Sequence, residues 1–69
     1  MAAKRNAKRA KYLADAMDHI LEARFALLMK RAAEERGDHT SAARFGREAH
    51  SHLQAAKRLL RQADAVGKR

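Results

Sequence analysis

The sequence predicts an all-α protein, an antiparallel hairpin of two long helices, and three observations lead to this prediction. Strong helix formers dominate, since 17 of the 69 residues are alanine and most others are Leu, Arg, Lys, Glu or Met. β-Branched residues, from which strands are mostly built, amount to one Ile, one Val and one Thr. The chain contains no proline, and its first glycine, Gly37, lies near the middle.

The first helix is expected over residues 5–36. Apolar residues recur there at steps near three and four, which traces one face of a helix. This first apolar stripe consists of Ala10, Leu13, Met17, Ile20, Leu21, Phe25, Leu28 and Ala32. At 1.5 Å per residue, such a helix would be roughly 40–50 Å long.

The residues after the first helix read as a stop signal followed by a start signal. Gly37 follows the basic Arg36, and glycine tolerates the positive φ that often ends a helix. Asp38, Thr40 and Ser41 can each cap the N-terminus of a following helix. A glycine-rich phosphate loop would need several glycines after a strand, and neither feature is present. We therefore expect a bend.

The second helix is expected over residues 40–66. Its apolar stripe consists of Ala42, Phe45, Ala49, Leu53, Ala56, Leu60, Ala63 and Val66. Two long helices joined by so short a link pack antiparallel, in the manner of a coiled coil. Gly46 falls inside this helix, where glycine is unfavourable, and we interpret it as a point of close approach.

The stretch GDHTSAARFGREA, Gly37 to Ala49, resembles the turn and second helix of a tetratricopeptide repeat and of the related MIT-type hairpins. Gly37 and Asp38 match the turn, while Ala42 and Ala49 match the small residues that let helices pack closely. Lys30 departs from the pattern, because the repeat has a small residue there. The resemblance implies a helical hairpin that binds protein, and it assigns no binding residues.

The apolar residues are too widely spread for one hairpin to bury. Leu27, Met29, Ala33 and Leu59 lie beside the two stripes. A single domain of 69 residues holds only a small core. We therefore predict a homodimer that forms a four-helix bundle, or a hairpin that completes its core on another protein. A monomer with a short third helix near the N-terminus is the alternative.

Positive charge gathers at the two ends of the chain. The net charge is +8, from 16 basic and 8 acidic residues. The hairpin would bring together Lys4, Arg5, Lys8, Arg9, Lys11, Lys68 and Arg69 at its open end. Cations oppose the dipole at a helix N-terminus, so segment 1–9 should fray unless an anionic partner binds it. The same fold would place Asp15 opposite Arg61 as an ion pair. A purely solubilising tail is the simpler reading of the cluster.

Composition and spacing favour a noncatalytic protein-interaction module, such as an adaptor, an assembly factor or an inhibitor of a larger complex. Phe25, Leu28 and Phe45 are the expected apolar contacts, and the basic end would steer the protein toward an acidic protein surface. The alternative is sequence-nonspecific DNA or RNA binding by the same cluster. No nucleophile–base arrangement is visible, so we do not expect an enzyme.

The four histidines do not predict a metal site. His50 and His52 are two residues apart, on nearly opposite sides of a helix, and Glu48 lacks a histidine three residues later. We expect His52 to be a hydrogen-bonded residue at the boundary of the apolar stripe. No cofactor is expected. Cysteine is absent, and no apolar run approaches the ~20 residues of a membrane span, so we expect a cytoplasmic protein without membrane contact.

Overall fold

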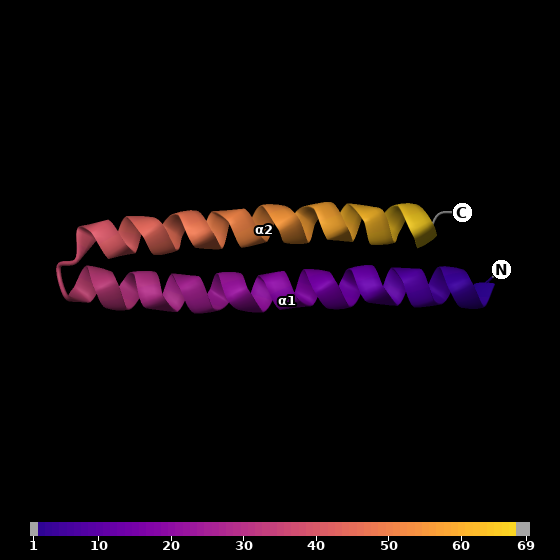
Figure 1. Cartoon of the computed structure of the whole chain (residues 1–69), viewed down its shortest axis with the longest axis horizontal. Coiled ribbons are helices and arrows are strands. Elements are labelled where there is room, and N and C mark those ends of the chain that lie inside the picture. Colours follow the sequence, from indigo (N-terminus) through magenta and orange to yellow (C-terminus); the bar gives the residue numbers. More distant parts are fainter. Residues whose placement is uncertain (1, 68–69) are drawn as a thin grey trace.

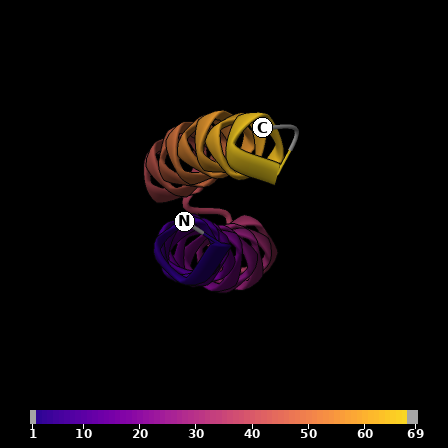
Figure 2. The same cartoon turned by 90° about the vertical axis from the view of Figure 1, so that its right-hand side faces the viewer.

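The computed structural model describes residues 2–67 and shows two helices folded side by side as an antiparallel hairpin (Figure 1). Helix α1 spans Ala2–Glu35 and helix α2 spans His39–Gly67. The predicted hairpin is thus confirmed, and both helices begin slightly earlier than expected. Seen from the open end, the helices cross at a shallow angle (Figure 2). The molecule is a rod with extents of 54 × 13 × 10 Å.

The helices pack through alanine. Every buried side chain among residues 3–67 is an alanine: Ala16, Ala23, Ala26 and Ala33 from α1, and Ala42, Ala49, Ala56 and Ala63 from α2. We refer to these eight residues as the alanine seam. The α2 members are spaced by seven residues, the repeat of left-handed coiled coils. Single methyl groups at the contact let helix axes approach to the short end of the usual ~8–10 Å range.

The first apolar stripe does not form the contact between the helices, which corrects the prediction for α1. Met17, Leu21, Phe25 and Leu28 are all more than half exposed. The face of α1 that packs on α2 carries Ala16, Ala23, Ala26 and Ala33 instead. Leucine or phenylalanine at these positions would hold the two helices farther apart than their alanines allow. On α2, the predicted stripe contains all four buried alanines, although Leu53 and Leu60 remain exposed.

The bend between the helices follows the predicted stop and start signals. Gly37 has a φ of 76°, the left-handed conformation that glycine adopts without a Cβ penalty. The Asp38 N–H donates to the Ala33 carbonyl (2.9 Å) and the Gly37 N–H to the Glu34 carbonyl (3.0 Å), which is the Schellman pattern. Asp38 also caps α2, because its Oδ1 accepts a hydrogen bond from the Ser41 N–H at 3.1 Å.

The cap makes stability depend on pH in the acid range. Hydrogen bonds from the Ser41 side chain and backbone lower the pKa of Asp38. A carboxylate with a lowered folded-state pKa stabilises the hairpin above its unfolded pKa, and this contribution disappears as pH falls through the folded value. Asparagine caps helices about as well but does not titrate. We therefore expect the melting temperature to fall more between pH 7 and pH 3 in the wild type than in Asp38→Asn. An equal fall in melting temperature for the two proteins, measured by circular dichroism, would contradict this role of Asp38.

Gly46 lies where a long side chain of α1 crosses α2. A Cβ on Gly46 would meet the Cδ and Cε of Lys30 at 3.6 Å, an ordinary van der Waals distance. The expected close approach of another helix is not found here, because the group beside Gly46 is a flexible side chain and not backbone.

Replacing Gly46 by alanine is expected to stabilise the protein by about 1 kcal/mol, because alanine loses less backbone entropy in a helix and the space is available. The melting temperature should rise by roughly 4–8 °C. Gly37→Ala is the matched control, and it should lower the melting temperature because its φ of 76° strains any residue with a Cβ. A lower melting temperature for Gly46→Ala would show that Lys30 cannot yield.

Candidate interaction surface

The large apolar side chains lie on the outside of the hairpin. Those exposed by 39% or more are Leu13, Met17, Leu21, Phe25, Leu27, Leu28, Leu53 and Leu60. Six of the eight belong to α1, and Leu28 is the most exposed at 67%. Contiguous apolar surface on a soluble protein commonly marks an interaction site. The candidate functional surface therefore lies mainly on α1.

Two rows of these side chains lie on the same side of the alanine seam. Lys30 crosses Gly46, and the Arg9 guanidinium lies against Gly67, with its Nε 3.4 Å from a Cβ built there. The edge of α1 that carries Arg9 and Lys30 therefore faces one row of α2. The residues of that row are seven apart: Gly46, Leu53, Leu60 and Gly67. Leu13, Ile20 and Leu27 form the next row of α1 on that side, also at intervals of seven.

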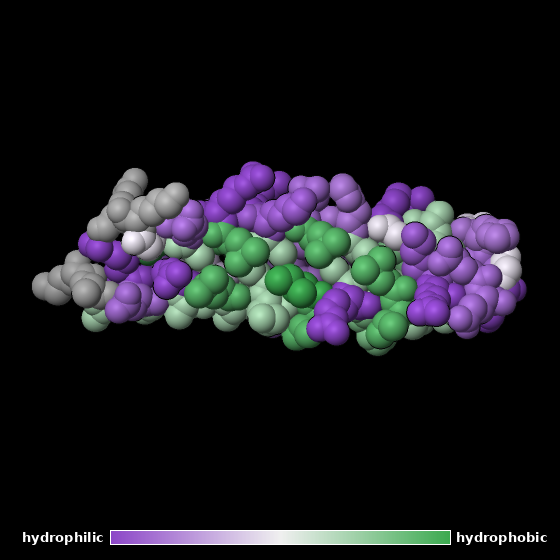
Figure 3. Space-filling view, turned by 180° about the vertical axis from the view of Figure 1, so that it is seen from behind, coloured by the Kyte–Doolittle hydropathy of each residue, from purple (hydrophilic) through white to green (hydrophobic). Residues whose placement is uncertain are grey.

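Further exposed apolar side chains lie next to these two rows, on the outer surface of α1. Leu21, Phe25 and Leu28 follow one another at steps of four and three, so they are neighbours on the helix. Leu21 and Phe25 line one shallow open hollow with Glu22. Leu27 and Leu28 line another with Arg24 and Arg31. The space-filling view in Figure 3 shows hydrophobic residues gathered midway along the rod, over both helices.

We define the apolar face as Leu13, Met17, Ile20, Leu21, Leu27, Leu28, Leu53 and Leu60, with Phe25 at its outer border. Two of the three predicted apolar contacts, Leu28 and Phe25, lie on or beside it. Phe45 does not. It is half-buried, its ring lies 5.3 Å from the Arg44 guanidinium carbon, and it shares a row with His52 on the other side of the seam.

That other side of the hairpin carries a pair of histidines. The Nδ1 atoms of His19 and His52 are 2.9 Å apart and hydrogen-bonded, and the ring centroids are 5.1 Å apart. The prediction that His52 is a hydrogen-bonded boundary residue is confirmed. Its partner was not predicted, although a signal existed: each histidine lies three residues after a seam alanine, Ala16 or Ala49.

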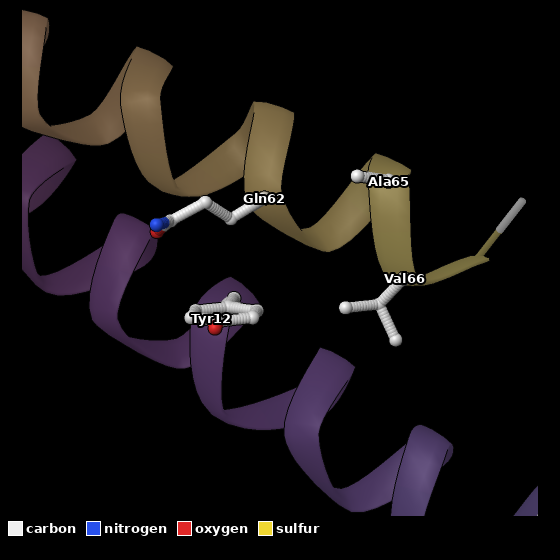
Figure 4. A pocket seen from close by; sticks show the side chains of 4 residues that line it. All are labelled: Tyr12, Gln62, Ala65 and Val66. Carbon is white, nitrogen blue, oxygen red and sulfur yellow. The ribbon is translucent and has the colours of Figure 1, made fainter. Parts of the chain in front are cut away.

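The basic side chains near the N-terminus are all on the surface. We define the basic end as Lys4, Arg5, Lys8, Arg9 and Lys11, every one of which is exposed in the first turns of α1. Lys68 and Arg69, also assigned to this cluster, lie outside the described residues. Beside the basic end, Tyr12 of α1 and Gln62, Ala65 and Val66 of α2 line a shallow hollow (Figure 4). The N-terminal cations thus border a small surface shared by both helices.

The expected cross-hairpin ion pair does not form. Within residues 2–67, Asp15 and Arg61 make no ion pair with each other, whereas Arg31 and Glu35 do so along α1, at 3.8 Å. Both members of that pair are largely exposed, and such pairs contribute little to stability.

The described residues contain no cluster of three or more side chains able to hold a metal ion. The hollows in its surface are shallow and open. No helix among the described residues combines the length and apolar character that crossing a bilayer requires.

Comparisons of the chain with protein-family models, with curated proteins and with solved structures give no match.

Proposed function

We propose that the protein is a noncatalytic interaction module that binds other protein surfaces through its apolar face, first of all a second copy of itself. The observation that supports this most directly is the distribution of apolar side chains. Alanines fill the contact between the helices, while the leucines of α1 remain exposed. Full burial of one leucine side chain stabilises by about 1.5–3 kcal/mol, so the largest source of apolar stabilisation in this chain is still unused.

The hairpin alone gives a second reason for association. Its radius of gyration is 15.7 Å, whereas a compact chain of this length would have about 11 Å. A rod of this shape buries a small share of its surface, and short chains are marginally stable. Docking two hairpins through their apolar faces would form a four-helix bundle with a larger core.

The placement of the leucines favours a second copy as the occupant of the apolar face. A two-fold axis crossing α1 between Leu21 and Leu28 places Leu21 of one copy level with Leu28 of the other. Leucines then meet leucines, which is the self-complementarity that an isologous dimer requires.

The basic end supplies the second contact of this module, toward an acidic protein surface. Its five cations are exposed and clustered, and such a cluster raises the association rate with an oppositely charged partner. Nucleic acid is a less favourable target, because Asp15, Asp18 and Glu22 interrupt the positive surface along α1. The described residues also offer few aromatic rings for base stacking.

The test of the basic end compares two probes, a poly-glutamate peptide and a 20-base-pair DNA duplex, at 50 and 300 mM salt. We expect the wild type to bind poly-glutamate, and the triple variant Lys4→Ala, Lys8→Ala, Lys11→Ala to bind it at least tenfold more weakly. These lysines are chosen because Arg9 packs against Gly67.

The matched control removes the same charge elsewhere, by Arg47→Ala, Lys57→Ala and Arg58→Ala. It should lose clearly less affinity than the triple lysine variant. Tight duplex binding at 50 mM salt that disappears at 300 mM, without binding to poly-glutamate, would instead establish the nucleic-acid function. Equal losses in the two triple variants would reduce the basic end to a solubilising tail.

A further inference from the structure

The histidine pair has a geometry that neither the alanine seam nor the proposed protein contacts require. His19 belongs to α1 and His52 to α2, and their Nδ1 atoms approach to 2.9 Å near the middle of the rod. Both side chains are half-buried, and their rings are tilted by 37° to each other. Imidazole nitrogens are frequent ligands of copper, nickel and zinc, and here two of them point at one location from separate helices.

We propose that His19 and His52 form an interhelical binding site for a divalent transition-metal ion, with copper(II) as the preferred ion. Two nitrogens bound at about 2.0–2.1 Å and at a right angle lie about 2.9 Å apart, whereas a tetrahedral angle separates them by about 3.3 Å. The observed 2.9 Å matches the right-angled edge of square-planar or octahedral coordination. Copper(II) combines this geometry with the highest position in the affinity order of divalent ions.

Metal binding needs only a local change of the pair. In the hydrogen-bonded state, one ring carries its proton on Nδ1 and donates it to the other Nδ1. Transfer of that proton to Nε2 of the same ring frees both Nδ1 lone pairs while each imidazole remains neutral. Small rotations of the two rings then direct the lone pairs to a common point beside the nitrogen–nitrogen axis.

The remaining coordination positions would be filled from solvent, because the described residues bring no third metal-binding side chain to the pair. Asp15 and Glu48 each lie one turn before a histidine of the pair, at i−4. Their negative charges would favour a cation nearby. A site with two protein ligands that link α1 to α2 is expected to bind one ion per chain and to stabilise the hairpin on binding.

The experiment uses two double variants that contain the same number of histidines. His39→Ala with His50→Ala removes two exposed histidines and keeps the pair, whereas His19→Ala with His52→Ala removes the pair. Titration with copper(II) chloride at pH 7.5, followed by calorimetry, should give one ion per chain in the first variant. The second variant should bind copper(II) at least about tenfold more weakly. Zinc(II) chloride should bind the first variant more weakly than copper(II).

Electron paramagnetic resonance of copper(II) bound to the variant that keeps the pair tests the coordination without altering the site. Two nitrogen ligands should be visible in the hyperfine structure, and copper(II) should raise the melting temperature of this variant. Equal copper(II) affinity in the two double variants would overturn the proposal, as would fewer than two nitrogen ligands. Because the spectroscopic test uses intact His19 and His52, it decides the question even if removing the pair unfolds the chain.

Discussion

Ala49→Leu is expected to destabilise the hairpin by about 1–3 kcal/mol or more, the usual cost of overpacking a closely packed core. Ala49 is 2% exposed and belongs to the alanine seam, in which the buried residues of the facing helix are also alanines. A leucine there adds three carbon atoms to a contact built from methyl groups. The helices must separate locally, which loosens the alanine contacts on both sides.

The measurement is a thermal melt followed by circular dichroism, and each kcal/mol should lower the melting temperature by roughly 4–8 °C. Ala43→Leu is the matched control, because Ala43 is an exposed alanine of the same helix. It should change the melting temperature by little, since leucine and alanine are both strong helix formers. If Ala49→Leu melted at or above the wild-type temperature, the seam would not be closely packed.

The double substitution Leu21→Glu and Leu28→Glu is expected to convert a dimer to a monomer while leaving the hairpin intact. Light scattering should give a molar mass near twice 7.8 kDa for the wild type and near 7.8 kDa for the variant. The two leucines are 54% and 67% exposed in the single chain, so their replacement removes little from the alanine seam. Burying four carboxylates in a dimer core would cost several kcal/mol for each ion.

The matched control adds the same charge to the exposed surface of α2, by Ser51→Glu and Gln54→Glu. This variant should keep the wild-type mass. The proposal of a self-associating module would fail if the wild type were a monomer at concentrations near 100 µM. A dimer in all three proteins would instead assign the self-association to another surface.

The sequence by itself determined the helices, their antiparallel arrangement and the chemistry of the bend. Alanine-rich composition without proline left helix as the favoured local structure, and Gly37 with Asp38 encoded one reversal through backbone conformation and side-chain capping. These features depend on residues close in the chain, so sequence reasoning could reach them. The same reasoning placed Leu28 and Phe25 at an apolar surface, and the structure leaves both exposed.

Only the tertiary structure decided which apolar surface of α1 meets α2. Periodicity selects residues by polarity, and Ala16 and Leu21 both count as apolar, so it could not distinguish a face of methyl groups from a face of larger side chains. The choice depends on how closely two helices approach over their whole length, which is a property of the pair and not of either helix. The contact between His19 and His52 has the same origin: residues 33 apart in sequence meet because the alanines on both helices allow the close approach.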